Sequence, residues 1–187
     1  FSLSKYLSKF SKLYPDVKFK IFTDSASNLN DYLLNRKIDI LFDYIPNINY
    51  SEKFDLNVNP ISQYNTCFAC SKSYYEKIKN DIHSLSDFSK YTLVVSGSSR
   101  RRQMLDEILQ KNNIDLKPKD LMPDSKLMAD YIKDNNYIGY FIEDELEEYD
   151  LVKIELKEDM PINPIGIIYP KNINTVAKDF VNVVLDK

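Results

Sequence analysis

The spacing of apolar residues along the chain predicts helices and strands in alternation. Apolar side chains that recur every three or four residues indicate helices, whereas short β-branched runs or strict alternation indicate strands. The pattern predicts helices over residues 1–14, 29–33, 103–109, 127–132 and 176–184. It predicts strands over residues 17–22, 38–42, 66–70, 92–96, 120–122, 137–142, 151–156 and 165–169, with a polar loop over residues 43–59. Such alternation is typical of an α/β fold built around mainly parallel sheets.

Residues 92–109 are the stretch around which the rest of the chain is organised. A buried strand leads through Gly97 into a helix whose N-cap is Ser98 or Ser99. The first turn of this helix holds residues 100–102, which are three of the chain's four arginines. That turn carries partial positive charge and normally favours acids. A bound anion would explain the arginines, and three solvated side chains at a loop tip are the alternative.

The composition is that of a soluble globular protein. The chain has 187 residues, of which 43% are hydrophobic and 28% charged, enough to bury the core of one domain or of two small lobes. A formal net charge of −3 argues against this segment alone wrapping a nucleic-acid backbone, which needs a clustered basic face. The sequence has no apolar run of about 18 residues, the length of a transmembrane helix. Because Phe1 is not a start residue and no signal peptide is visible, we expect the natural N-terminus to lie upstream.

Residue types that carry catalysis or bind metals are few. Cys67 and Cys70 form a C-x-x-C motif inside a predicted strand, where odd spacing sends the thiols to opposite faces. We therefore expect buried cysteines in a reducing compartment and no zinc or redox site. The single histidine, His83, precedes a helix-capping pattern that opens at Ser84. Residues 143–148 form an acidic run typical of a solvated face, and no glycine-rich phosphate loop occurs, so we expect neither an enzyme nor a metal or cofactor site.

Hydroxyl and acidic side chains gather at three predicted strand-to-helix junctions. The groups are Thr23 with Ser25 and Ser27, Ser98 with Ser99, and Asp124 with Ser125. Each group alone fits ordinary capping of a helix N-terminus. Together they indicate a ligand site, because ligands of open α/β sheets bind beyond the carboxyl ends of the strands, where helix N-termini gather.

In its order of motifs the chain resembles the effector-binding domain of LysR-type transcriptional regulators. That family commonly shows a helix ending in F-x-x-x-Y-P-x-V, which matches Phe10–Val17, and later L-x-x-G-x-x-D-x-x-L, which Leu33–Leu41 resembles. The segments Ser84–Phe88, Ser125 with Leu127 and Met128, and Tyr137–Leu146 fall where the family has matching segments. The resemblance covers nearly the whole chain. Asn35 and either Asn135 or Asn136 stand where glycines are usual, a mild departure because asparagine tolerates left-handed conformations.

The resemblance implies a type 2 periplasmic-binding-protein-like fold, with two α/β lobes and an interlobe cleft that holds a small molecule. Lobe one would comprise residues 1–70 plus 166–187 and lobe two residues 71–165, with crossings near Cys70 and Ile165. The family's first strand and its serine or threonine ligand turn would precede Phe1.

The function that the resemblance implies is ligand sensing for transcription regulation in the cytoplasm. The partners would be a small-molecule effector and a second copy of the chain, giving a homodimer or, in the full-length protein, a tetramer. The dimer would pair through residues 3–14 and 17–36. DNA would be bound only by an N-terminal domain outside this sequence, and no membrane would be involved. A stand-alone solute-binding receptor of a transport system is the main alternative, and a bare interaction module with an empty cleft is a third.

The effector site is expected at the three polar junctions. Its predicted lining is Thr23, Ser25, Ser27, Tyr44, Ser98, Ser99 and Ser125, with Tyr140 or Phe141 as an apolar wall. At ~100° per residue, Arg101 falls near the middle of its helix's apolar stripe, and Arg100 and Arg102 fall to either side. A guanidinium there cannot be buried unpaired, so it must face the cleft or an acid on a neighbouring loop. We predict a small anionic effector, a carboxylate or phosphate, clamped by Arg101 with Arg100 as second choice. The family often has a small hydroxyl residue at the position of Arg101, so the site would be an adapted one.

Overall fold

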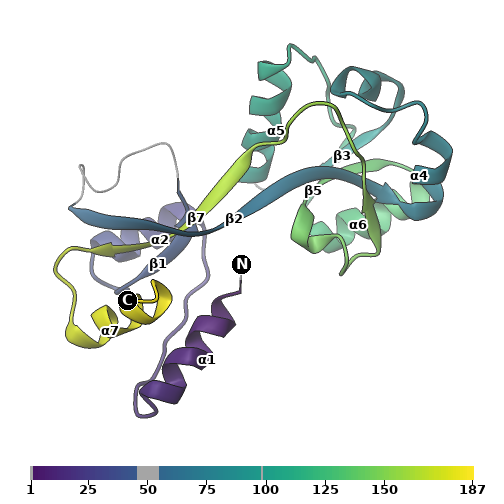
Figure 1. Ribbon diagram of the computed structural model, residues 1–187. Helices are drawn as coiled ribbons and strands as arrows, with labels where there is room; N and C mark the ends of the chain where they lie inside the picture. Colours follow the sequence, from purple (N-terminus) through teal and green to yellow (C-terminus); the bar gives the residue numbers. More distant parts are fainter. Residues whose placement is uncertain (1, 46–54, 98) are drawn as a thin grey trace. The chain divides into compact units, whose positions relative to one another are not determined.

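The computed structural model of the chain describes residues 2–45, 55–97 and 99–187 (Figure 1). Its helices are α1 (Leu3–Leu13), α2 (Ala26–Leu34), α4 (Lys72–Ile78), η1 (Leu85–Lys90), α5 (Ser99–Lys111), α6 (Ser125–Asn135), η2 (Glu143–Glu145) and α7 (Thr175–Val184). Its strands are β1 (Leu41–Tyr44), β2 (Leu56–Ser71), β3 (Leu93–Ser96), β4 (Asp120–Met122), β5 (Ile138–Ile142), β6 (Leu151–Lys153) and β7 (Ile162–Pro170). Every helix predicted from the apolar spacing is therefore present.

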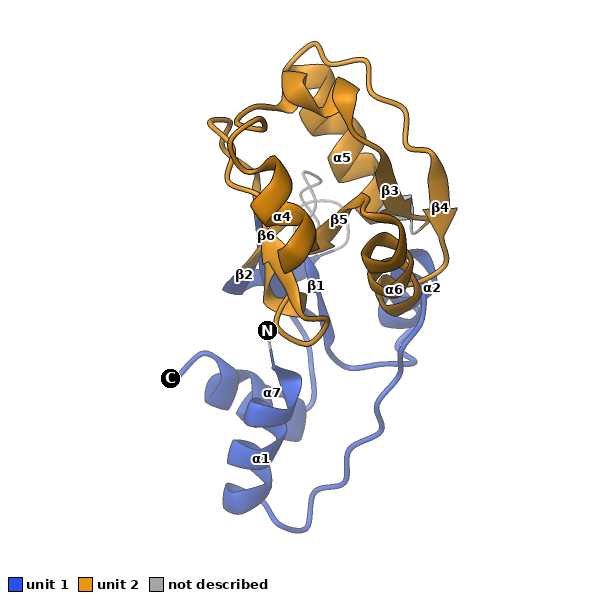
Figure 2. Cartoon of the chain, turned by 90° about the vertical axis from the view of Figure 1, so that its right-hand side faces the viewer, with its two compact units in different colours: residues 1–63, 163–187 blue, residues 64–162 orange. Residues whose placement is uncertain are grey.

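The chain forms two compact units, coloured separately in Figure 2. Unit 1 consists of residues 1–63 and 163–187, and unit 2 consists of residues 64–162. The chain passes from one unit to the other twice, first within β2 and then at the start of β7. The lobe boundaries expected from the resemblance, near Cys70 and Ile165, stay a prediction.

The strand order is β1-β7-β2-β5-β3-β4, and β6 pairs with β2. Strand β3 runs parallel to β4 and β5, whereas β5 and β6 run antiparallel to β2, and β1 runs antiparallel to β7. The expectation of mainly parallel sheets is wrong for these ladders. Helices α5 and α6 connect β3, β4 and β5 as crossovers and keep them parallel. Each of the antiparallel ladders includes β2 or β7.

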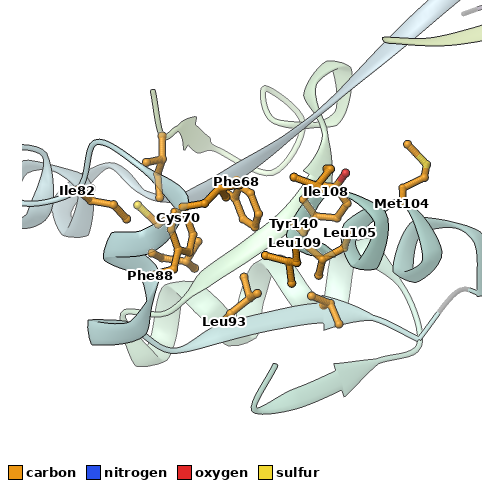
Figure 3. Close-up of a cluster of buried hydrophobic side chains, with 14 of the residues drawn as sticks. Phe68, Cys70, Ile82, Phe88, Leu93, Met104, Leu105, Ile108, Leu109 and Tyr140 are labelled. Atoms are coloured by element: carbon orange, nitrogen blue, oxygen red, sulfur yellow. The ribbon is translucent and has the colours of Figure 1, made fainter. Parts of the chain in front are cut away.

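Unit 2 has a hydrophobic cluster on each face of its strands. On β2, Cys67 packs under α6, whereas Phe68 and Cys70 pack on the face covered by α5 and η1 (Figure 3). Strand β5 alternates in the same way, with Tyr140 on the α5 face and Phe141 on the α6 face. Successive residues of a strand point to opposite faces, and the two cysteines are buried and free, as predicted. They cannot form one site.

Unit 1 also buries both faces of a strand. Ile167 of β7 clusters with Phe10 of α1 and Phe180 of α7, whereas Ile168 packs with Leu33 of α2. The apolar stripe predicted for the first helix therefore serves the core of its own unit.

Residues 17–22 do not form the strand that their alternation predicts. Among the described residues, none exchanges a backbone hydrogen bond with Lys18–Phe22, and Ile21 is 56% exposed. The prediction is wrong because alternation specifies two faces, whereas a strand also needs a partner for its backbone groups. The segment borders a cavity of about 640 Å³, whose other walls come from α1, α2, β1 and α7.

Other differences concern where elements begin and end. Strand β2 starts at Leu56, well ahead of the predicted residue 66, and α4 has no counterpart among the predicted helices. The left-handed residue after α2 is Arg36, with φ 58°, and not Asn35. Counted from Leu33 to Asp39, Arg36 is the residue at the glycine position of the L-x-x-G-x-x-D motif, so the expectation for Asn35 is one residue out. The Arg36 guanidinium donates to the carbonyl of Asn172 at 2.8 Å, a contact that helps to hold this unusual conformation. After α6 the left-handed residue is Asn136, as the resemblance implies.

Candidate functional site

Helix α5 turns one face toward the strands of unit 2. This face consists of Met104, Leu105, Ile108 and Leu109, all buried (Figure 3). The helix follows β3 and Gly97, whose N–H donates to the carbonyl of Met122 on the neighbouring strand at 2.6 Å. In the first turn, the Arg101 side chain is 16% exposed, whereas that of Arg102 is 35% exposed and pairs with Asp106 at 2.9 Å. Arg101 therefore lies on the inner side of the helix, as its helical spacing predicts.

The Arg101 guanidinium belongs to a three-residue polar network. Its Nη1 donates to the Ser125 hydroxyl at 2.6 Å, and its Nη2 lies 3.4 Å from Oε1 of Glu145. The Ser125 hydroxyl in turn donates to Oε2 of Glu145 at 3.1 Å. The network carries one positive and one negative charge, so it is neutral as a whole. The sequence predicts that Arg101 faces either the cleft or an acid on a neighbouring loop. In the structure it faces such an acid, Glu145, on a neighbouring turn.

Three separate elements supply these side chains. Ser125 is the first residue of α6, and the carboxylate of Asp124 caps that helix by accepting from Leu127 N–H at 2.8 Å. Glu145 is the last residue of η2, the turn that follows β5. The network thus links the starts of two helices with the end of a neighbouring turn. Because Asp124 does the capping, the Ser125 hydroxyl is left to bind Arg101.

A buried polar pair lies beneath the α5 face. The Tyr140 hydroxyl donates to Oγ1 of Thr66 at 2.6 Å, and both residues are almost fully buried. Burial raises the pKa of Tyr140, while the Thr66 hydrogen bond and the charge of Arg101 act in the opposite direction. Tyr140 therefore stays a neutral donor. The Tyr64 hydroxyl also reaches this face, 3.7 Å from the sulfur of Met104.

The other predicted site residues divide between the units. Thr23, Ser25, Ser27 and Tyr44 belong to unit 1. Of these, Thr23 borders the 640 Å³ cavity, and Ser25 caps α2 by accepting from Asn28 N–H at 3.3 Å.

In unit 2 the structure brings Arg101 and Ser125 together above the face that holds Tyr140. Phe141 lies on the opposite face, packed with Met128 of α6. Ser98 lies outside the described residues, and for Ser99 and Arg100 only the helical backbone is described.

Sequence reasoning missed two members of this region, Glu145 and Thr66. Glu145 sits in an acidic run, a pattern that carries no signal for which carboxylate will turn inward. Thr66 begins the apolar run of its strand, where a β-branched residue fits without any polar role. Only their partners, Arg101 for Glu145 and Tyr140 for Thr66, reveal the roles of these two residues, and both partners lie far away along the chain.

Unit 2 also contains a cavity of about 240 Å³ that includes none of the predicted site residues. Its charged lining consists of Glu143, Lys153, Glu155, Glu158 and Asp159. Lys153 is already paired with Glu143 at 3.1 Å and with Glu155 at 3.8 Å. The acidic excess of this lining makes it a poor place for an anion.

The described residues hold no cluster of three or more histidine, cysteine or acidic side chains placed to bind a metal ion. His83, the single histidine, contacts the carbonyl of Asn80 at 3.0 Å through its ring. Asp87 accepts from the backbone N–H of Ser84 at 2.9 Å and completes the predicted capping box. No described helix combines the length and apolar character needed to cross a bilayer.

Comparison with known proteins identifies the class to which this architecture belongs. The model of the LysR substrate binding domain matches residues 2–187. The chain is therefore a member of the LysR substrate-binding domain family. No curated protein sequence matches it significantly.

Solved structures share the fold at low sequence identity. The effector binding domain of QuiR in complex with shikimate has a TM-score of 0.78 and 19% identity, over 99% of this chain and 89% of that one. The Synechocystis PCC6803 CcmR regulatory domain in complex with 2-PG has a TM-score of 0.80 and 12% identity, over 98% and 89%. Full-length CbnR complexed with target DNA has a TM-score of 0.77 and 14% identity, over 99% of this chain and 65% of that chain.

Proposed function

We propose that this chain is the effector-sensing domain of a LysR-type transcriptional regulator, and that its effector is a small carboxylate or phosphate. Membership of the family over residues 2–187 supports a sensing role. The similar structures of QuiR and CcmR carry shikimate and 2-PG, and that of CbnR carries DNA. In the full-length protein, effector binding here would change how a separate domain holds DNA in the cytoplasm.

The inward-facing Arg101 is the observation that carries the choice of an anion. A guanidinium has five N–H donors, and the hydrogen bonds seen for Arg101 among the described residues are those to Ser125 and Glu145. It is 84% shielded from water, which strengthens its attraction for a negative group. Ser125 adds a hydroxyl at the same place. A carboxylate or phosphate meets these groups better than a neutral molecule does.

We further propose that the domain binds its effector without catalysing a reaction. The residues around His83, the most enzyme-like group in the sequence, are engaged in capping η1. Catalysis by a nucleophile would need a general base within hydrogen-bond reach of it. Ser125 donates to Glu145 at 3.1 Å, but Arg101 contacts both side chains, so the three form a charge-paired network around the guanidinium.

A thermal-shift screen that pairs each acid with its amide tests the charge class directly. Benzoate and benzamide form one such pair, and shikimate and its amide form another. An acid that is the effector should raise the melting temperature, corresponding to about 2.7 kcal/mol at a concentration of 100 Kd, whereas its amide should leave it unchanged. Equal stabilisation by an acid and its amide would show that the site does not select for charge.

A further inference from the structure

We propose that Glu145 is a built-in competitor, which occupies Arg101 until the acid group of an effector displaces it. The proposal rests on the function proposed above, because it concerns the same guanidinium. It assigns a role to a carboxylate that pairs with Arg101 and accepts from the Ser125 hydroxyl. Glu145 would set how strongly the acid group of an effector must bind Arg101 in order to displace it.

The geometry of the ion pair is that of a replaceable contact. Charge-assisted bonds between a guanidinium and a carboxylate normally measure about 2.7–2.9 Å and often use both nitrogens of the fork. Here only one nitrogen faces Glu145, at 3.4 Å, because the other donates to Ser125 at 2.6 Å. A ligand acid that engages both nitrogens at normal distance gains more from Arg101 than Glu145 does.

Burial explains why some carboxylate must be present when no effector is bound. The Arg101 side chain is only 16% exposed, and a shielded charge without a partner is costly. Glu145 supplies the counter-charge from a side chain that is 26% exposed and stands at the end of a three-residue turn. It can therefore rotate toward water when another anion takes its place. The exchange keeps Arg101 neutralised in both states.

The exchange has one consequence for specificity and one for the turn that carries Glu145. A neutral molecule cannot replace Glu145, since that would leave the guanidinium without a counter-charge. An effector also releases the Ser125 hydroxyl, which donates to Glu145 at 3.1 Å in its absence. The freed carboxylate of Glu145 belongs to η2. Another residue of this turn, Glu143, forms an ion pair with Lys153 of β6 at 3.1 Å. The turn after β5 thus responds to the occupant of Arg101.

Inorganic phosphate is a suitable probe, because it needs no knowledge of the natural effector. Glu145→Gln removes the competing charge but keeps the size of the side chain, so phosphate binding by calorimetry should tighten roughly tenfold relative to wild type. The double variant Arg101→Ala with Glu145→Gln should lose this gain.

The matched control uses the neighbouring ion pair of the same helix. Asp106→Asn frees Arg102, which is more exposed, and should change phosphate binding by less than about twofold. The proposal is overturned if Glu145→Gln binds phosphate no more tightly than wild type, or if Asp106→Asn gains as much.

The two proposals can fail separately. An acid effector that depends on Arg101, yet binds Glu145→Gln no better than wild type, would remove the competitor and keep the anionic effector. If Glu145→Gln binds phosphate more tightly than wild type, but no small acid acts on the regulator through Arg101, Glu145 would stay the competitor and the anionic effector would be removed.

Discussion

The guanidinium of Arg101 and the hydroxyl of Ser125 lie 2.6 Å apart, although 24 positions separate them along the chain. The contact joins the first turn of α5 to the first turn of α6. Two of the three polar junctions recognised in the sequence therefore meet in unit 2. Because Glu145 completes the group, a charged network links the two helix starts, in addition to the cap that Asp124 provides for α6.

Replacing Gly139 should distinguish tight packing from mere backbone preference. A Cβ added at Gly139 would lie 2.4 Å from a ring carbon of Phe141 and 3.2 Å from Ile132, both buried. Gly139→Ala should therefore lower the free energy of unfolding by about 1–3 kcal/mol. At Gly97 the nearest atom is 3.5 Å away, so Gly97→Ala is the control and should cost less. Equal midpoints of urea unfolding for the two variants would contradict the packing explanation.

The bond between Tyr140 and Thr66 should contribute measurably to stability. Thr66→Val keeps the shape of the side chain but leaves the buried Tyr140 hydroxyl without its acceptor. An unsatisfied buried group costs about 1–3 kcal/mol. Removing both hydroxyls together, with Thr66→Val and Tyr140→Phe, should cost less than the sum of the two single changes. Additive losses in urea unfolding would show that the two hydroxyls do not act as a pair.

Both cysteines should be inert in the folded chain. Burial raises the pKa of each thiol to about 12, and the nearby Glu143 carboxylate adds to the effect at Cys67. The reactive form is the thiolate, so iodoacetamide at about pH 8 should label neither thiol in native protein and both in urea. Mass spectrometry counts the adducts. Labelling of Cys67 or Cys70 under native conditions would contradict their burial.

Self-association should depend on the exposed edge of α1. Leu13 is 61% exposed, whereas Tyr6, the other residue expected at the edge, packs against the core of unit 1. Leu13→Asp should raise the dimer dissociation constant roughly tenfold, since it places a charge in an apolar contact. Val176→Asp, at an exposed position on α7, is the control. A wild-type chain that sediments as a monomer at tens of micromolar would contradict the expected dimer.

The sequence allowed most of the fold to be predicted, because helices reveal themselves through a local period. The stripe of Met104, Leu105, Ile108 and Leu109 was sufficient to place Arg101 on the inner side of α5. Strands depend on distant partners, and this is why residues 17–22 were assigned wrongly. Glu145 was invisible for the same reason, since its partner Arg101 is 44 positions away.

Calorimetric titration of an acid from the thermal-shift screen into wild type and Arg101→Ala tests the central claim most directly. Charge-assisted bonds from a guanidinium contribute about 2–4 kcal/mol, so Arg101→Ala should weaken binding at least roughly tenfold. Its melting temperature without ligand should barely change, because the substitution removes the shielded charge itself and leaves Glu145, which is 26% exposed, able to turn toward water. Arg102→Ala, on the outer side of the same helix, should bind the acid as wild type does. Equal affinity of wild type and Arg101→Ala for the effector would contradict the anion site.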